Sequence, residues 1–254
     1  MCRTVLPWLL ALIAATSAFA QADQAGYLYT YAINESRYGD FVYSVDAYKP
    51  VGSPNARIRP FVDVFGNDDS KSAGGSVPRI YSDNYAGGAF GLQYTTPAGL
   101  RIFAQAGATH SIGPIASVPS GGDVRGGIEL YREWGGPNNR KRTYGNFYGS
   151  GTYYSRYQDA VFYNQLETGR TSGSAKRPID TYVRGVLTAD SHSFYYDNIA
   201  EITAGVRFHP FGLKGPSIAL EEAAGIYTRA ALLPIGTNRS YFDFRPTISY
   251  GVNI

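Results

Sequence analysis

The sequence predicts an all-β fold, an antiparallel up-and-down transmembrane β-barrel of about 12 strands, and three observations carry this prediction. Segments of alternating polarity recur along the chain. Many of them reach the roughly nine to eleven residues that a tilted strand needs to cross a bilayer. Turn-forming residues separate them. Of the 254 residues, 15% are aromatic and 17% are charged, a composition that can bury a core and excludes a disordered chain.

The first residues have the pattern of a cleaved secretory signal peptide. A short basic start at Arg3 precedes the apolar run from Val5 to Ala15, and Ala18-Phe19-Ala20 supplies the small residues of a cleavage site. We therefore expect a signal peptide over 1–20 and a barrel domain over 21–254. Cleavage would remove Cys2, the single cysteine of the chain, so no disulfide is expected.

Twelve segments are expected to be strands because apolar and polar residues alternate in them or turn formers bound them. In the third segment Ile58 and Val64 share one face, whereas Arg59 and Asp63 share the other. In the last segment every second residue from Phe242 onward belongs to the apolar face. The expected strands are 26–33, 39–48, 56–66, 85–95, 98–108, 122–134, 143–156, 158–169, 179–190, 196–208, 216–230 and 240–254.

Two architectures fit amphipathic strands in an exported chain, a membrane barrel and a soluble periplasmic β-sandwich. Sandwich strands usually have about five or six residues, and many segments here are longer. In a barrel the apolar faces meet lipid, so charged residues can occupy the middle of a strand when they point into the lumen. The barrel is preferred, and a sandwich that binds a ligand stays as an alternative.

The polar faces of the strands carry charges that we expect in the lumen. Seven arginines and five carboxylates occupy these faces, so the expected lumen charge is 7 − 5 = +2. If these groups pair with one another they hold the lumen closed, and if they stay accessible they favour anionic solutes or an acidic polysaccharide. The candidate lumen-facing charges are Arg57, Arg59, Asp63, Arg101, Arg125, Glu129, Asp180, Arg184, Glu201, Arg207, Asp243 and Arg245.

Tyrosines gather near the ends of several expected strands. The clusters are Tyr27/Tyr29/Tyr31, Tyr153/Tyr154 and Tyr195/Tyr196. An amphipathic ring suits the boundary between lipid and water. We therefore expect these tyrosines in the aromatic girdles of the outer surface.

A second function class, an outer-membrane lipid hydrolase, is considered because serine lies beside histidine at His110-Ser111 and at Ser191-His192-Ser193. Adjacent residues on a strand face opposite ways, so neither pair is a ready-made dyad. No G-x-S-x-G turn, zinc-ligand spacing or nucleotide-binding fingerprint occurs. The loop Gly66-Asn67-Asp68-Asp69 is better explained as a flexible acidic loop than as a cation site. No catalytic, cofactor-binding or metal-binding residue is therefore assigned, and no cofactor is expected.

Several segments, in order along the chain, resemble the C-terminal domain of bacteriophage adsorption protein A. They are IYSDNYAGGAFGLQYTTPAGLRIFAQAG (80–107), GGIELYREWG (126–135), YGNFYGSGTYYSRYQDAVFYNQLETG (144–169), SFYYDNIAEITAGVRFHPF (193–211) and YFDFRPTISYGVNI (241–254). The resemblance implies an outer-membrane barrel associated with exopolysaccharide export and used by phage as a receptor.

The function expected from the sequence is therefore that of a non-enzymatic outer-membrane barrel, related to exopolysaccharide export or to surface reception of phage. Expected partners are outer-membrane lipid, an anionic polysaccharide, export-machinery proteins and phage. Nucleic acid is not an expected partner, because 23 basic residues against 20 acidic ones do not make the dense positive surface that phosphate binding needs.

Overall fold

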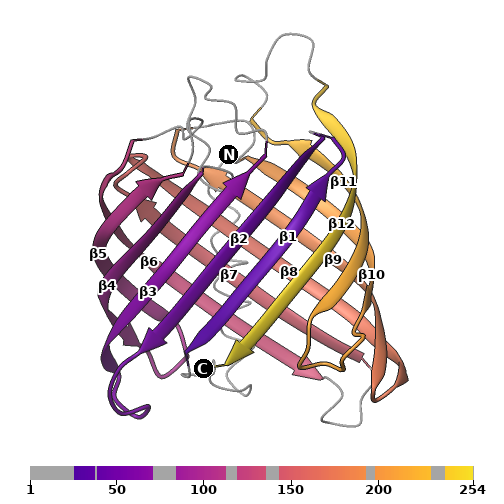
Figure 1. The fold of residues 1–254 in the computed structure, drawn as a ribbon, viewed down its shortest axis with the longest axis horizontal. Coiled ribbons are helices and arrows are strands. Elements are labelled where there is room, and N and C mark those ends of the chain that lie inside the picture. The colour runs from indigo at the N-terminus through magenta and orange to yellow at the C-terminus, as the bar shows by residue number, and fades with distance from the viewer. Residues whose placement is uncertain are drawn as a thin grey trace.

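Twelve antiparallel strands form a closed barrel (Figure 1). The computed structural model describes residues 26–37, 39–70, 84–112, 119–135, 143–192, 198–229 and 238–253. The strands are β1 (Tyr27–Glu35), β2 (Asp40–Pro50), β3 (Ile58–Asp69), β4 (Tyr85–Thr95), β5 (Arg101–Ser111), β6 (Gly121–Gly135), β7 (Thr143–Tyr154), β8 (Asp159–Ser174), β9 (Arg177–Asp190), β10 (Ile199–Phe208), β11 (Ser217–Tyr227) and β12 (Ser240–Asn253). The all-β barrel of about twelve strands is thereby confirmed. The expected signal peptide lies outside the described residues.

Among the described residues, no helix is long and apolar enough to cross a membrane.

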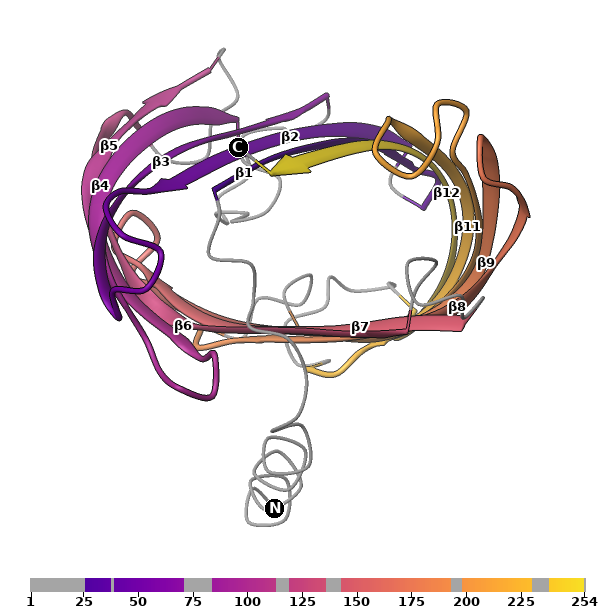
Figure 2. The same cartoon turned by 90° about the horizontal axis from the view of Figure 1, so that it is seen from below.

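Pairing of the first and last strands closes the sheet. Tyr27 lies opposite Asn253, so β1 begins where β12 ends. We call this end of the barrel the terminus end and the opposite end the loop end. The two longest connections between strands, residues 70–84 and 228–239, both belong to the loop end. Short turns on the periplasmic side and longer loops outside are typical of outer-membrane barrels. Figure 2 shows the barrel as a flattened ring in which β1 and β2 lie across from β7.

The outer surface of the barrel is apolar and the inner surface is polar. On β10, Ile202 and Val206 are exposed, whereas Glu201 and Thr203, one residue away from Ile202, are buried. The same alternation holds on β12, where exposed Phe242 and Phe244 flank buried Asp243. Exposed apolar side chains around a whole barrel are compatible with lipid and not with water. The chain therefore has the construction of a transmembrane barrel.

The tyrosines of β1 differ from expectation. Leu28 lies opposite Val252 of β12, and neighbours across a ladder share one face. Since Val252 faces outward, Leu28 faces outward too, and Tyr27, Tyr29 and Tyr31 point into the lumen. Tyr154 also lines the lumen, and Tyr195 and Tyr196 lie outside the described residues. The placement of Tyr27, Tyr29, Tyr31 and Tyr154 in an outer girdle was wrong, because the neighbouring strand fixes the face.

The hairpin between β8 and β9 is longer than the sequence indicated. β8 continues to Ser174 and β9 begins at Arg177, whereas 170–178 contained no expected strand. Gly173 adopts φ = 80°, which a glycine reaches without steric cost, and this allows a tight reversal. The glycine and serine residues of this stretch predicted a loop, whereas they pair as strand residues at the end of the barrel.

Candidate functional site

The candidate site is a cavity in the barrel lumen of about 620 Å³, lined by residues of every strand except β4. Its charged lining consists of five arginines and six carboxylates, a difference of −1. Seven of these charges were expected from the sequence, four arginines and three carboxylates, a difference of 4 − 3 = +1. The charged lining residues are Glu35, Arg37, Asp46, Asp63, Arg101, Arg125, Glu129, Arg184, Glu201, Glu221 and Arg245.

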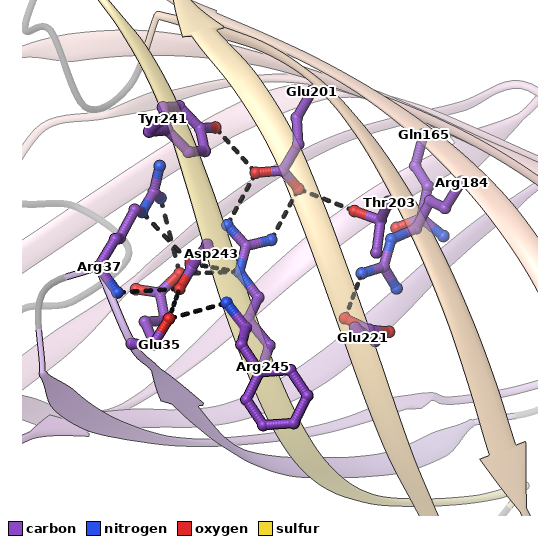
Figure 3. A network of polar contacts seen from close by, with 12 residues as sticks. Glu35, Arg37, Gln165, Arg184, Glu201, Thr203, Glu221, Tyr241, Asp243 and Arg245 are labelled. Carbon is purple, nitrogen blue, oxygen red and sulfur yellow. Dashed lines mark hydrogen bonds and ion pairs between the residues drawn. The ribbon is translucent and has the colours of Figure 1, made fainter. Parts of the chain in front are cut away.

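One network of ion pairs ties β10 and β12 to β1 (Figure 3). Arg245 donates from Nη1 and Nη2 to the two carboxylate oxygens of Glu201 at 2.7 Å each, and from Nε to Asp243 at 2.7 Å. Arg37 lies 3.4 Å from Asp243, and the Tyr241 hydroxyl donates to Glu201 at 2.8 Å. A guanidinium that uses all its nitrogens in this way is held in one orientation.

A second network joins β8, β9, β10 and β11. Arg207 binds the two oxygens of Glu167 at 3.1 Å each. Arg184 donates to Glu221 at 2.7 Å, and Tyr182 donates to the same carboxylate. These side chains are largely shielded from water, so removal of one partner would leave an uncompensated charge.

On the other side of the lumen, arginines are stacked on aromatic rings. The Arg125 guanidinium lies 3.6 Å from the ring centre of Phe65 and 5.2 Å from that of Tyr154. Arg101 lies 4.5 Å from the ring centres of both Tyr48 and Phe103. Each has a single carboxylate partner among the described residues: Asp123 for Arg125 and Glu129 for Arg101. Cation–π contact therefore supplies part of their stabilisation.

Between these charged walls the cavity is lined by hydroxyls, amides and tyrosine rings. Tyr29 on β1 is 44% exposed, so its ring is open to the lumen. The ring centres of Tyr29 and Tyr31 lie 6.0 Å apart. The ring centres of Tyr148 on β7 and Tyr163 on β8 are also 6.0 Å apart. Such rings offer an apolar face together with a hydroxyl, a combination that suits a ligand with both apolar and polar sides.

Eleven of the twelve candidate charges occupy inward positions of strands, as the burial pattern shows. They are Arg59 and Asp63 on β3, Arg101 on β5, Arg125 and Glu129 on β6, Asp180 and Arg184 on β9, Glu201 and Arg207 on β10, and Asp243 and Arg245 on β12. Arg57 is different. It is exposed and lies just before β3, which begins at Ile58.

Sequence reasoning missed several lumen carboxylates, namely Glu35, Asp46, Glu167 and Glu221. The alanine-rich run that follows Glu221 weakens the alternation there, so its inward position was not predicted. Ile218 and Leu220 face outward, and extending this alternation by one residue places Glu221 on the inward face. Asp46 shares the inward face of β2 with Tyr48. Glu35, Asp46 and Glu221, together with Arg37, change the charge of the cavity lining from the +1 of its expected members to 1 + 1 − 3 = −1.

Ser191, His192 and Asp159 lie together without the geometry of a hydrolytic triad. Ser191 Oγ donates to Asp159 at 2.5 Å and accepts from the backbone N–H of Ala160 at 3.1 Å. His192 uses the same nitrogen, Nδ1, toward Asp159 at 3.0 Å and toward Ser191 at 3.5 Å. In a triad, the carboxylate and the nucleophile contact different ring nitrogens.

The other two histidines also have structural partners. His110 lies 3.3 Å from the hydroxyl of Ser120, and no carboxylate contact of His110 occurs in the described part of the chain. His209 contacts Asp180 at 2.9 Å, and Thr171 donates to the same carboxylate at 2.7 Å. No group of three metal-ligating residues occurs among the described residues.

Comparison with known proteins gives structural likenesses only. No protein-family model and no curated protein matches the sequence. The β domain of the Bordetella autotransporter BrkA is 13% identical, with TM-score 0.42, covering 89% of this chain and 98% of its own. An outer membrane channel from Pseudomonas putida F1 is 8% identical, with TM-score 0.42 and coverage of 92% and 97%. A bacterial polysaccharide outer membrane secretin is 8% identical, with TM-score 0.42 and coverage of 92% and 99%.

Proposed function

We propose that this chain is a non-enzymatic outer-membrane barrel whose lumen binds a saccharide chain, in a role related to exopolysaccharide export. The observation that carries the proposal is the lumen wall itself. Tyrosine rings such as Tyr29 and Tyr148 line a cavity together with arginine, carboxylate, amide and hydroxyl groups. A sugar ring has an apolar face that can stack on an aromatic ring and hydroxyls that donate to carboxylates and accept from guanidinium groups.

The charge balance of the lumen bears on the class of saccharide. Five arginines and six carboxylates line the cavity, and most of them contact one another. A lumen of this kind does not select anions by its net charge. A neutral saccharide is therefore the substrate class that the cavity as a whole fits best.

The absence of an enzymatic role is supported by the use of Ser191. Its hydroxyl donates to Asp159 and accepts from the backbone N–H of Ala160, both at the start of β8. Ser70 makes the corresponding bond to the backbone N–H of Phe41, at 2.8 Å, on the other side of the barrel. A serine that serves the same structural purpose in two places is explained without a reaction.

The experiment is recording of ion current through the purified protein in planar bilayers, with and without maltohexaose. We expect a small conductance with weak ion selectivity, reduced when the neutral oligosaccharide is added. Tyr29→Ala should weaken this block, because the exposed ring is lost. Absence of both conductance and oligosaccharide binding by calorimetry would contradict the proposal and would favour reception of phage at the loop end.

A further inference from the structure

The two halves of the barrel have the same strand register. We call β1–β6 the first half-barrel and β7–β12 the second half-barrel. Tyr29 pairs with Asp46 across β1 and β2. Tyr148 pairs with Gln165 across β7 and β8, and both members lie 119 residues later (148 − 29 and 165 − 46). Corresponding pairs can be followed around the whole ring, so each lumen position of one half has a counterpart in the other.

The loop end repeats a short sequence in the two halves. Ser36-Arg37-Tyr38-Gly39-Asp40-Phe41-Val42 joins β1 to β2, and Ser155-Arg156-Tyr157-Gln158-Asp159-Ala160-Val161 joins β7 to β8. Five of these seven residues are identical. Gly39 has φ = 62° and Gln158 has φ = 53°, and Gln158 is the one non-glycine residue with positive φ in the described part of the chain.

The hydrogen bonds of these connections repeat as well. The Ser36 N–H donates to the carbonyl of Phe244 at 3.2 Å, and the Phe244 N–H donates to Ser36 Oγ at 2.8 Å. Ser155 and Val124 exchange the same two bonds at 2.9 and 2.7 Å. Phe244 and Val124 are counterparts, each between an aspartate and an arginine. Shared sequence, register, φ angle and hydrogen bonds indicate two copies of one six-stranded unit.

Val124 and Phe244 each lie between an aspartate and an arginine, and that aspartate and arginine form an ion pair in both halves. Arg125 Nε donates to Asp123 at 2.8 Å, and Arg245 Nε donates to Asp243 at 2.7 Å. The remaining surroundings differ. Arg245 also contacts Glu201 and Glu35, and the register places Gly87 and Tyr154 at the corresponding positions around Arg125.

The two environments leave different N–H groups of the guanidinium without a hydrogen-bond partner. Ion pairing uses the N–H groups, which lie in the plane of the guanidinium, and Arg245 commits Nε, Nη1 and Nη2 to carboxylates. Stacking uses the face of the group and leaves in-plane donors unused. Among the described residues, Arg125 donates to Asp123 alone, and Arg101 Nε is buried and has no hydrogen-bond partner.

We propose that the barrel is a duplicated six-stranded unit whose halves have diverged in the lumen, so that the charged groups of the second half-barrel support the fold through ion pairs and those of the first half-barrel bind saccharide. Arg101 and Arg125 donate to the oxygens of the sugar. Asp46 and Asp63, which also line the first half-barrel, accept from its hydroxyls. Their counterparts are Gln165 and Arg184, so this pair of acceptors is confined to one half. The inference rests on the proposed saccharide-binding function.

The test compares the two counterpart arginines in the full-length protein in detergent, with maltohexaose as the probe. Binding is measured by calorimetry and stability by thermal unfolding. We expect Arg125→Gln to weaken maltohexaose binding about tenfold, as for loss of one hydrogen bond from a charged donor, with a small change in unfolding temperature. Arg245→Gln should lower the unfolding temperature markedly and leave the affinity within about twofold of that of the unmodified protein.

Two controls keep the outcomes separate. Arg245→Lys replaces Arg245→Gln if the latter does not fold, and Arg125→Lys should recover part of the affinity because it restores a donor. If the unmodified protein binds maltohexaose and the two glutamine variants lose affinity equally, the division between the halves is wrong while the saccharide function stands. If the unmodified protein binds no maltohexaose, the proposed function itself fails.

Discussion

The two half-barrels stabilise buried arginine in different ways on nearly the same framework. In the second half, Arg184, Arg207 and Arg245 are bound by carboxylates two strands away in the sheet, and Arg207 also lies 4.3 Å from the ring centre of Tyr182. In the first half, Arg101 and Arg125 lie against aromatic rings and have one carboxylate each. The difference shows that the strand register sets the position of an arginine in the lumen. The residues around it decide whether its N–H groups are bound by carboxylates of the fold or have no such partner.

The largest expected effect comes from breaking the Arg245 network. Glu201→Gln removes the carboxylate that accepts two hydrogen bonds from Arg245 and leaves a buried guanidinium without that partner. We expect a loss of about 3–5 kcal/mol in the free energy of unfolding, measured by urea titration in lipid vesicles. The counterpart position in the first half-barrel is Gly87, so no equivalent change exists there. A loss below about 1 kcal/mol would show that the two halves are stabilised alike.

A smaller effect, equal in the two halves, is expected on the outer surface. Leu92 and Val206 occupy counterpart positions on β4 and β10, and both are exposed to the lipid side. Replacement of either by arginine should destabilise the barrel by about 2–4 kcal/mol near the bilayer midplane. Counterpart positions have the same depth, so the two losses should agree within about 1 kcal/mol. Gln165→Arg, which points into the lumen, is the control and should cost less.

The smallest effect concerns the turns at the loop end. Gln158 adopts the left-handed conformation that Gly39 adopts in the other half. Gly39→Gln should lower the free energy of unfolding by about 1 kcal/mol, because a side chain in this conformation meets the backbone. Gln158→Gly should be neutral or slightly stabilising in the same urea titration. A clear loss from Gln158→Gly would mean that the glutamine side chain, and not the backbone, holds this turn.

The fold was predictable from local pattern alone to an unusual degree. Alternation assigned the inward residues of β5, β10 and β12, such as Arg101, Glu201 and Arg245, because the side-chain period of a strand is two and lipid demands one apolar face. It failed where the apolar face is weak. On β1 the residues facing lipid include Thr30 and Ala32, and the tyrosines of the opposite face were more conspicuous.

The sequence predicted which arginines face the lumen but not which carboxylates bind them. The inward positions of Arg125, Arg245 and Asp243 followed from the sequence, whereas Asp123 was not among the expected lumen charges. Nothing in the sequence pattern showed that Glu201, 44 residues before Arg245, would take its two nitrogens. Glu201 and Arg245 lie on β10 and β12, which both pair with β11, so their contact depends on the register of three strands and not on the pattern within one strand.

The sequence by itself determined that the chain forms a barrel of about twelve strands, which residues of most strands face lipid, and that arginines occupy the lumen. These properties depend on the period of the strand and on the solvent that each face meets. Only the tertiary structure decided which charges line the cavity and which arginines are ion-paired or stacked. The closed register sets neighbours such as Gly87 or Glu201 beside otherwise equivalent arginines, and a buried charge is stabilised by its actual neighbours rather than by its place in the sequence.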